Sequence, residues 1–100
     1  MNLRKYMTIV LFDKFIPDVK KEELVHITFE PTGNPPTKAL LKILKNAMEI
    51  GNTHKIKVRI VFDTNNGVMS CRTTIWFVGK KYLLVKGNIA IPIESIYTVE

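Results

Sequence analysis

Residues 85–96 read VKGNIAIPIESI, and this stretch decides the fold. It contains the end of an apolar segment, a Gly-Asn turn, a short segment that stops at Pro92, and the start of another apolar run at Ile96. Proline has no N–H to donate to a sheet, so Pro92 ends a strand, and Pro92 to Ser95 is the right length for one 3₁₀ turn. The run 96–99 can then return as a fifth strand, which pairs with the first strand of a small barrel and leaves no exposed edge.

The residues before this stretch show the alternation of apolar and polar side chains that is typical of strands. The run 55–62 predicts a strand whose outer face carries Lys55, Lys57 and Arg59. Residues 64–67, Thr-Asn-Asn-Gly, tolerate the positive φ that a hairpin turn requires. The run 68–78 is too long to stay flat in a small sheet, so we expect it to bend and to serve two sheets. Strands at 82–86 and 89–91 complete the meander.

A helix is predicted directly before the first of these strands. The residues at the spacing of one buried helical face are Leu40, Ile43, Leu44, Ala47 and Met48. Either Asn34 or Thr37 is expected to cap the start of the helix, and Gly51-Asn52 suits its end. The opposite face carries a row of lysines, Lys38, Lys42 and Lys45, which is normal for a solvated helix face.

Residues 1–34 are interpreted as an arm of two strands. Residues 3–12 fit a helical stripe, but their β-branched and aromatic run favours a strand. Leu24 to Glu30 alternates cleanly and predicts a strand with Val25, Ile27 and Phe29 on one face. The Pro-rich segment 31–36 marks the boundary. We therefore expect an α+β, mainly β fold: the arm at 1–34, then a helix and a five-stranded antiparallel small barrel at 35–100, together forming one domain.

The order and length of these elements in residues 36–100 resemble SH3-like small barrels, and the preceding helix makes them similar to the Sm-like arrangement. Residues 58–63 with Gly67 stand where the Hfq group of bacterial RNA chaperones has an apolar strand and a turn. Residues 82–88 stand where that group has its second strand and basic turn. The Tyr-Lys-His uridine-binding motif of the group would fall near Ile91-Pro92-Ile93, and these residues have no base-stacking or phosphate-binding group. The resemblance therefore does not imply ring formation or pore-type RNA binding. The tail also resembles that of the YolD-like family of small bacterial proteins.

The net charge of +6 is concentrated in the middle of the chain. Residues 31–90 carry many lysines and arginines against only Glu49 and Asp63, whereas residues 1–30 are balanced. Such asymmetry favours a polyanionic partner. A small domain also needs some net charge to stay dispersed, so a solvated surface without a ligand is the competing interpretation.

Candidate nucleic-acid-binding residues lie on the expected barrel: Lys55, Lys57, Arg59, Arg72, Trp76, Lys80, Lys81 and Lys86. Basic side chains attract phosphate, and an exposed aromatic ring stacks on a base. Arg72 and Trp76 are expected on one face of one strand, although a single tryptophan is more often a core residue. We expect RNA or single-stranded DNA as the partner. The alternative is a protein-interaction or assembly module, whose apolar N-terminal segment packs on another copy or on another protein.

No pattern in the sequence predicts catalysis. His26 and His54 are far apart and have no neighbouring ligands at metal spacing, and Cys71, without a base to activate it, is expected to be a core or strand residue. We expect no enzyme activity, no cofactor, no metal and no small-molecule substrate. No apolar run approaches the ~18 residues of a membrane span. A single cysteine fits a reducing compartment, so a cytoplasmic location is expected.

Overall fold

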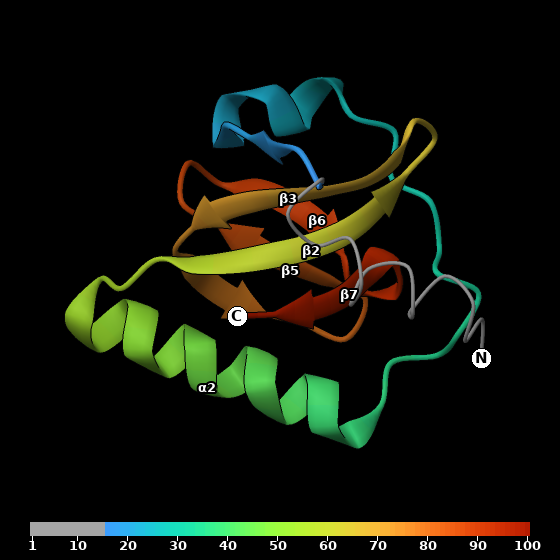
Figure 1. Cartoon of the computed structure of the whole chain (residues 1–100). Helices are drawn as coiled ribbons and strands as arrows, with labels where there is room; N and C mark the ends of the chain where they lie inside the picture. The colour runs from blue at the N-terminus through green and yellow to red at the C-terminus, as the bar shows by residue number, and fades with distance from the viewer. Residues whose placement is uncertain (1–15) are drawn as a thin grey trace.

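The computed structural model describes residues 16–100, which form an α+β fold that consists mainly of strands. The long helix α2 (Lys38–His54) lies along one side of the strands. The short 3₁₀ helix η2 (Lys21–His26) lies on the opposite side, next to β1 (Asp18–Val19) (Figure 1). The predicted fold class, mainly β with one α-helix, is confirmed for these residues. None of their helices is both long and apolar enough to cross a membrane.

The strands belong to two sheets. The first has the order β1-β3-β2-β7, with β2 (Val58–Thr64), β3 (Gly67–Thr73) and β7 (Ile96–Val99). The second has the order β4-β5-β6, with β4 (Ile75–Val78), β5 (Tyr82–Val85) and β6 (Ile89–Pro92). The expected return of the last strand onto the first barrel strand is confirmed, since β7 pairs antiparallel with β2. Within residues 16–100 neither sheet closes on itself, so the five-stranded barrel is not confirmed.

The bend expected in the run 68–78 is confirmed. Only Thr74 separates β3 in the first sheet from β4 in the second. The Thr74 carbonyl accepts a hydrogen bond of 3.0 Å from the Lys86 N–H, which attaches the bend to the turn after β5. A single stretch of chain therefore joins the two sheets.

The turns also form where the sequence predicted them. Gly67 and Gly87 take positive φ values of 104° and 90°, which glycine adopts without steric cost. After Pro92, the 3₁₀ helix η3 (Ile93–Ser95) leads directly into β7, and the Ser95 hydroxyl donates to the Pro92 carbonyl at 2.7 Å. These positions were predictable because the backbone requirement at each of them is local.

The helix was predicted correctly at its start and incorrectly at its end. Of the two candidate caps it is Thr37 that acts, since its hydroxyl accepts a 3.0 Å hydrogen bond from the Leu40 N–H. Instead of ending at Gly51-Asn52, α2 continues to His54 and stops at Lys55, which has a left-handed φ of 55°. Gly51 serves a different purpose. A Cβ on it would lie 2.8 Å from the Ile75 carbonyl oxygen, so its lack of a side chain lets α2 approach β4.

The N-terminal arm is the part of the fold that was predicted wrongly. Residues 24–26, predicted as the start of a strand, belong instead to η2, and residue 29 contributes only an isolated bridge to Thr64. Leu24 is buried, whereas Val25, expected on the buried face, is 64% exposed. A 3₁₀ turn brings every third residue to one side, so Leu24 and Ile27 face the core together. The strand predicted at 3–12 lies outside the described residues.

One core joins the helix, the arm and both sheets. Its buried members include Leu24, Leu44, Phe62, Ile75 and Ile91. Phe29 packs edge-on against Phe62 with ring centroids 5.2 Å apart, the arrangement that aromatic pairs prefer. Ile43 was expected on the buried face of α2 but is exposed.

Candidate nucleic-acid interface

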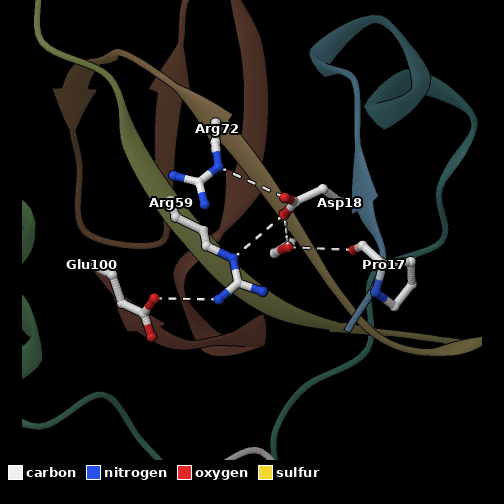
Figure 2. Close-up of polar contacts among 6 residues, drawn as sticks. Pro17, Asp18, Arg59, Arg72 and Glu100 are labelled. Carbon is white, nitrogen blue, oxygen red and sulfur yellow. Dashed lines mark hydrogen bonds and ion pairs between the residues drawn. The ribbon is translucent and has the colours of Figure 1, made fainter. Parts of the chain in front are cut away.

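β1 is attached to the first sheet through Asp18. The strand pairs in parallel with β3, although no strand was predicted at these residues. The Asp18 carboxylate accepts hydrogen bonds from the Ser70 hydroxyl and from Arg59 Nε–H, the latter at 3.4 Å. Its second oxygen lies 3.6 Å from Arg72 Nε (Figure 2). Asp18 thus connects two arginines of β2 and β3 to the arm.

Arg59 does not lie on the outer wet face of its strand, as the sequence predicted. It is only 8% exposed, and its guanidinium contacts the carboxylates of Asp18 and Glu100. Its Nη1 lies 3.2 Å from the Glu100 carboxylate, on the side away from Asp18 (Figure 2). The guanidinium of Arg59 is therefore engaged in contacts within the protein, which makes it unsuited to binding a phosphate backbone.

The pKa of Asp18 is held below its ordinary value by these neighbours. The hydrogen bond from Ser70 is the largest cause, and the guanidinium groups of Arg59 and Arg72 lower the pKa further. Burial acts in the opposite direction without cancelling the decrease. Asp18 therefore keeps its negative charge to a lower pH than a free aspartate would.

Three of the predicted residues meet in one hollow of about 210 Å³, which we call the lysine hollow. Its lining residues are Lys20, Lys21, Glu22, Lys57, Arg72, Thr73 and Lys86. Lys57, Arg72 and Lys86 were predicted from the sequence, whereas Lys20 and Lys21, at the start of η2, were not. No local pattern indicates this meeting, because it depends on the pairing of β1 with β3.

A second hollow, of about 370 Å³, lies where the turn before β5 meets the chain after β6, and we call it the tyrosine hollow. Its lining residues are Pro36, Lys80, Lys81, Tyr82, Pro92, Ile93 and Glu94. The Ile93 N–H donates to the Lys81 carbonyl at 2.8 Å, and the Gly79 N–H donates to that of Tyr82 at 2.8 Å. The first hydrogen bond joins the two segments, and the second closes the turn before β5. Tyr82 is 54% exposed.

Lys80 and Lys81 lie next to the start of β5, as expected from the sequence, whereas Tyr82 was predicted only as a strand residue. The signal that could have found it is the adjacency of an aromatic residue to a lysine pair. Lys86 lies at the other end of β5, so the residues expected to line the turn and strand divide between the two hollows.

The last two predicted residues lie elsewhere. Trp76 is 44% exposed on β4, at a register irregularity in the pairing with β5, and Phe77 beside it is exposed too. Arg72 and Trp76 do not share one strand face, because the bend at Thr74 puts them on strands of different sheets. Lys55 ends α2 instead of lying in a strand.

Cys71 lies in β3 and is fully buried, so its expected place in a strand of the core is confirmed. Burial is the main reason that its pKa is raised to about 11, and the nearby charge of Asp18 adds to the increase. The thiol is therefore protonated at neutral pH. In residues 16–100 no group of three or more histidine, cysteine or acidic residues is placed to hold a metal ion.

Comparison of the chain with models of known protein families, with curated proteins and with solved structures found no match.

Proposed function

We propose that the protein binds single-stranded nucleic acid, either RNA or DNA, and that the tyrosine hollow receives one nucleotide. The observation that carries this proposal is the convergence of the exposed Tyr82 ring with Lys80 and Lys81 in one hollow. Stacking of a base on an aromatic ring contributes about 1–3 kcal/mol whatever the base, and lysines attract the phosphate that follows it.

The chemistry of the hollow suits a nucleotide better than a simple anion. Pro36, Pro92 and Ile93 give it apolar walls, while the two lysines supply positive charge. No ion pair within residues 16–100 involves Lys80 or Lys81. Their charges are therefore available to a ligand, and a base can lie against the proline and tyrosine surfaces.

We also propose that this fold is related to the SH3-like or Sm-like small barrels, because its elements follow in a similar order. The helix α2 precedes β2, and the chain bends between β3 and β4. After a single 3₁₀ turn, β7 pairs with β2. The Tyr-Lys-His motif of the Hfq group has no counterpart in residues 91–93. Instead, Lys80, Lys81 and Tyr82 bring an aromatic and basic groups to the same hollow. We propose a binding role without catalysis, in the cytoplasm.

Fluorescence anisotropy with labelled oligo-uridine and oligo-thymidine at low salt tests the proposal. Tyr82→Ala should weaken binding by about 5- to 100-fold, because the stacking surface is lost. Tyr82→Phe keeps the ring and should bind like the unaltered protein. Lys42→Gln, on the outer face of α2 away from the tyrosine hollow, serves as a control for altered net charge.

Absence of saturable binding at low salt would overturn the proposal in favour of a protein-interaction module. The neighbouring exposed rings of Trp76 and Phe77 on β4 favour that alternative. An apolar interface of this kind would persist at high salt, whereas phosphate binding weakens steeply.

A further inference from the structure

The lysine hollow has a different composition from the tyrosine hollow and lies at the other end of β5. Its cations come from segments far apart in the sequence: Lys20 and Lys21 beside β1, Lys57 before β2, Arg72 on β3, and Lys86 in the turn after β5. Among residues 16–100, no aromatic residue lines it. The chemistry of this hollow therefore points to a ligand other than a nucleobase.

Backbone contacts hold these cations in place. The Lys86 N–H donates to the Thr74 carbonyl at 3.0 Å, which fixes the turn after β5 next to the end of β3. Lys21 Nζ lies 3.9 Å from the position that a Cβ on Gly87 would take, so the ammonium of η2 lies beside the same turn. The cations are thus brought together by the fold.

The hollow carries an uncompensated positive charge. Within residues 16–100, Glu22 is the only carboxylate that lines it, and no ion pair involves Lys20, Lys21, Lys57 or Lys86. Asp18 lies 3.6 Å from Arg72 Nε, but the Arg72 side chain is 66% exposed and its terminal N–H groups remain available. Like charges held together in this way repel one another, and an anion placed between them removes the repulsion.

A polar atom of Thr73 provides independent support for a ligand. Thr73 lines the hollow and is 2% exposed, and its Oγ1 is buried without a hydrogen-bond partner. No other side-chain nitrogen or oxygen buried in residues 16–100 lacks a partner. Such groups are rare in folded proteins, and a water or an anion bound there would satisfy this one. A hydroxyl donates readily to an anionic oxygen.

The size of the hollow limits the ligand. Its volume of about 210 Å³ lies below the roughly 300–1,000 Å³ of sites for drug-sized molecules. A phosphate or diphosphate group fits this space.

We propose that the lysine hollow is a binding site for a compact phosphate anion, either free phosphate or diphosphate or the terminal phosphate monoester of an oligonucleotide. The lysines act as point charges, and Arg72 supplies planar N–H groups that match phosphate oxygens. Thr73 contributes a neutral donor at the wall.

Calorimetric titration of the full chain with sodium diphosphate and with sodium phosphate, at constant ionic strength, tests the site. One saturable event is expected. Lys57→Gln and Lys86→Gln should each weaken it by about 3- to 10-fold, because a charge-assisted contact is lost. Thr73→Val, close in shape, should weaken it several-fold, and Thr73→Ser should retain binding. The matched controls Lys42→Gln and Lys45→Gln, on the outer face of α2, change the net charge equally and should leave the affinity unchanged.

Amide NMR shifts of the unaltered protein locate the binding site without any variant, so the test remains possible if a variant folds poorly. Diphosphate should shift the signals of Thr73 and Lys86 while that of Tyr82 stays in place. The proposal is overturned by the absence of a saturable event, by equal weakening in the α2 controls, or by shifts centred on Tyr82. These probes contain no base, so this test and the Tyr82→Ala test can fail separately.

Two labelled oligonucleotides identify the source of the phosphate. If the ligand is a terminal phosphate monoester, a 5′-phosphorylated oligonucleotide should bind more tightly than its 5′-hydroxyl counterpart, and Lys86→Gln should remove the difference. If the ligand is free phosphate or diphosphate, the two oligonucleotides should bind alike while diphosphate still saturates the site. Either result supports an anion site in the lysine hollow.

Discussion

Asp18 shows how much one carboxylate can connect. It contacts two arginines and a serine on β2 and β3 from a strand of only two residues (Figure 2). Its partner Arg59 is nearly buried, and a buried cation needs compensation to be tolerated. Asp18 and Glu100 provide it from opposite sides, so each carboxylate helps to hold a chain segment on β2.

We predict that Asp18→Asn lowers the free energy of unfolding at neutral pH by no more than about 1 kcal/mol, because half of the side chain is exposed and water screens its charge. The folded pKa of Asp18 is below the ordinary 3.8, so its contribution is present above that pH and is lost as the pH falls through the folded pKa. Urea unfolding at neutral pH and at stepwise lower pH should show the difference between the two proteins shrinking in acid.

Glu49→Gln provides the control for that comparison. Glu49 is an exposed carboxylate on α2 without an ion pair in residues 16–100. It should change stability little at any pH. A gap between Asp18→Asn and the unaltered protein that stays constant down to strong acid would show that the charge of Asp18 is not what stabilises β1.

At the level of elements, the contact between α2 and β4 depends on Gly51. We predict that Gly51→Ala destabilises the protein by about 1 kcal/mol or more, because the added methyl would collide with the Ile75 carbonyl and with Thr74. Helix propensity alone would give the opposite sign, a gain of about 1 kcal/mol. Thermal or urea unfolding measures the result.

Asn46→Ala is the matched change on the exposed face of the same helix. It should raise stability by a few tenths of a kcal/mol, since alanine is the better helix former. If Gly51→Ala raised stability to a similar degree, it would contradict the conclusion that the contact between α2 and β4 requires a glycine at position 51.

The elements that the sequence predicted correctly are those with local requirements. Positive φ at Gly67 and Gly87, and the missing N–H of Pro92, each act within a few residues. Gly51 was interpreted as a helix end, because the contact with β4 that requires a glycine there is not visible in the sequence. The segment 24–30 alternates like a strand, but Leu24 is buried through packing that only the folded chain supplies. β1 is too short to carry any pattern.

For the whole molecule, positive charge is distributed over separate surfaces. The sequence placed Lys57, Arg72 and Lys86 correctly as exposed cations, yet it could not bring Lys20 and Lys21 to them, because a parallel pairing across half the chain has no local signal. Arg59 was indistinguishable from its neighbours by spacing alone. Its burial depends on β1 and Glu100, which are distant in sequence.

We predict that this distribution is visible in the salt dependence of oligonucleotide binding. Each neutralised phosphate of a single strand adds about −0.7 to the slope of log K against log salt. The double variant Lys80→Gln and Lys81→Gln should flatten the slope by roughly one unit. Tyr82→Ala should lower affinity with little change in slope, because stacking releases no counterions.

The double variant Lys42→Gln and Lys45→Gln removes the same charge from α2 and should leave the slope nearly unchanged. Anisotropy titrations over a salt series provide the measurement. Equal flattening in both double variants would mean that the oligonucleotide responds to net charge and not to the tyrosine hollow.

The pairing of β1 with β3 also has a consequence for how the molecule opens. Two strand residues hold this pair together, although Asp18 and Ser70 are 52 positions apart. Detaching β1 and η2 exposes Leu24 but breaks no pairing between β2 and β3, so this segment can exchange its amide protons through a local opening that leaves α2 and the β2–β3 hairpin folded. An anion held between Lys21 and Lys86 binds only the closed form and raises the free energy of that opening. The bound anion then stabilises the attachment of β1 and η2 to the rest of the fold, and slower deuterium uptake at the Val19 amide would show this.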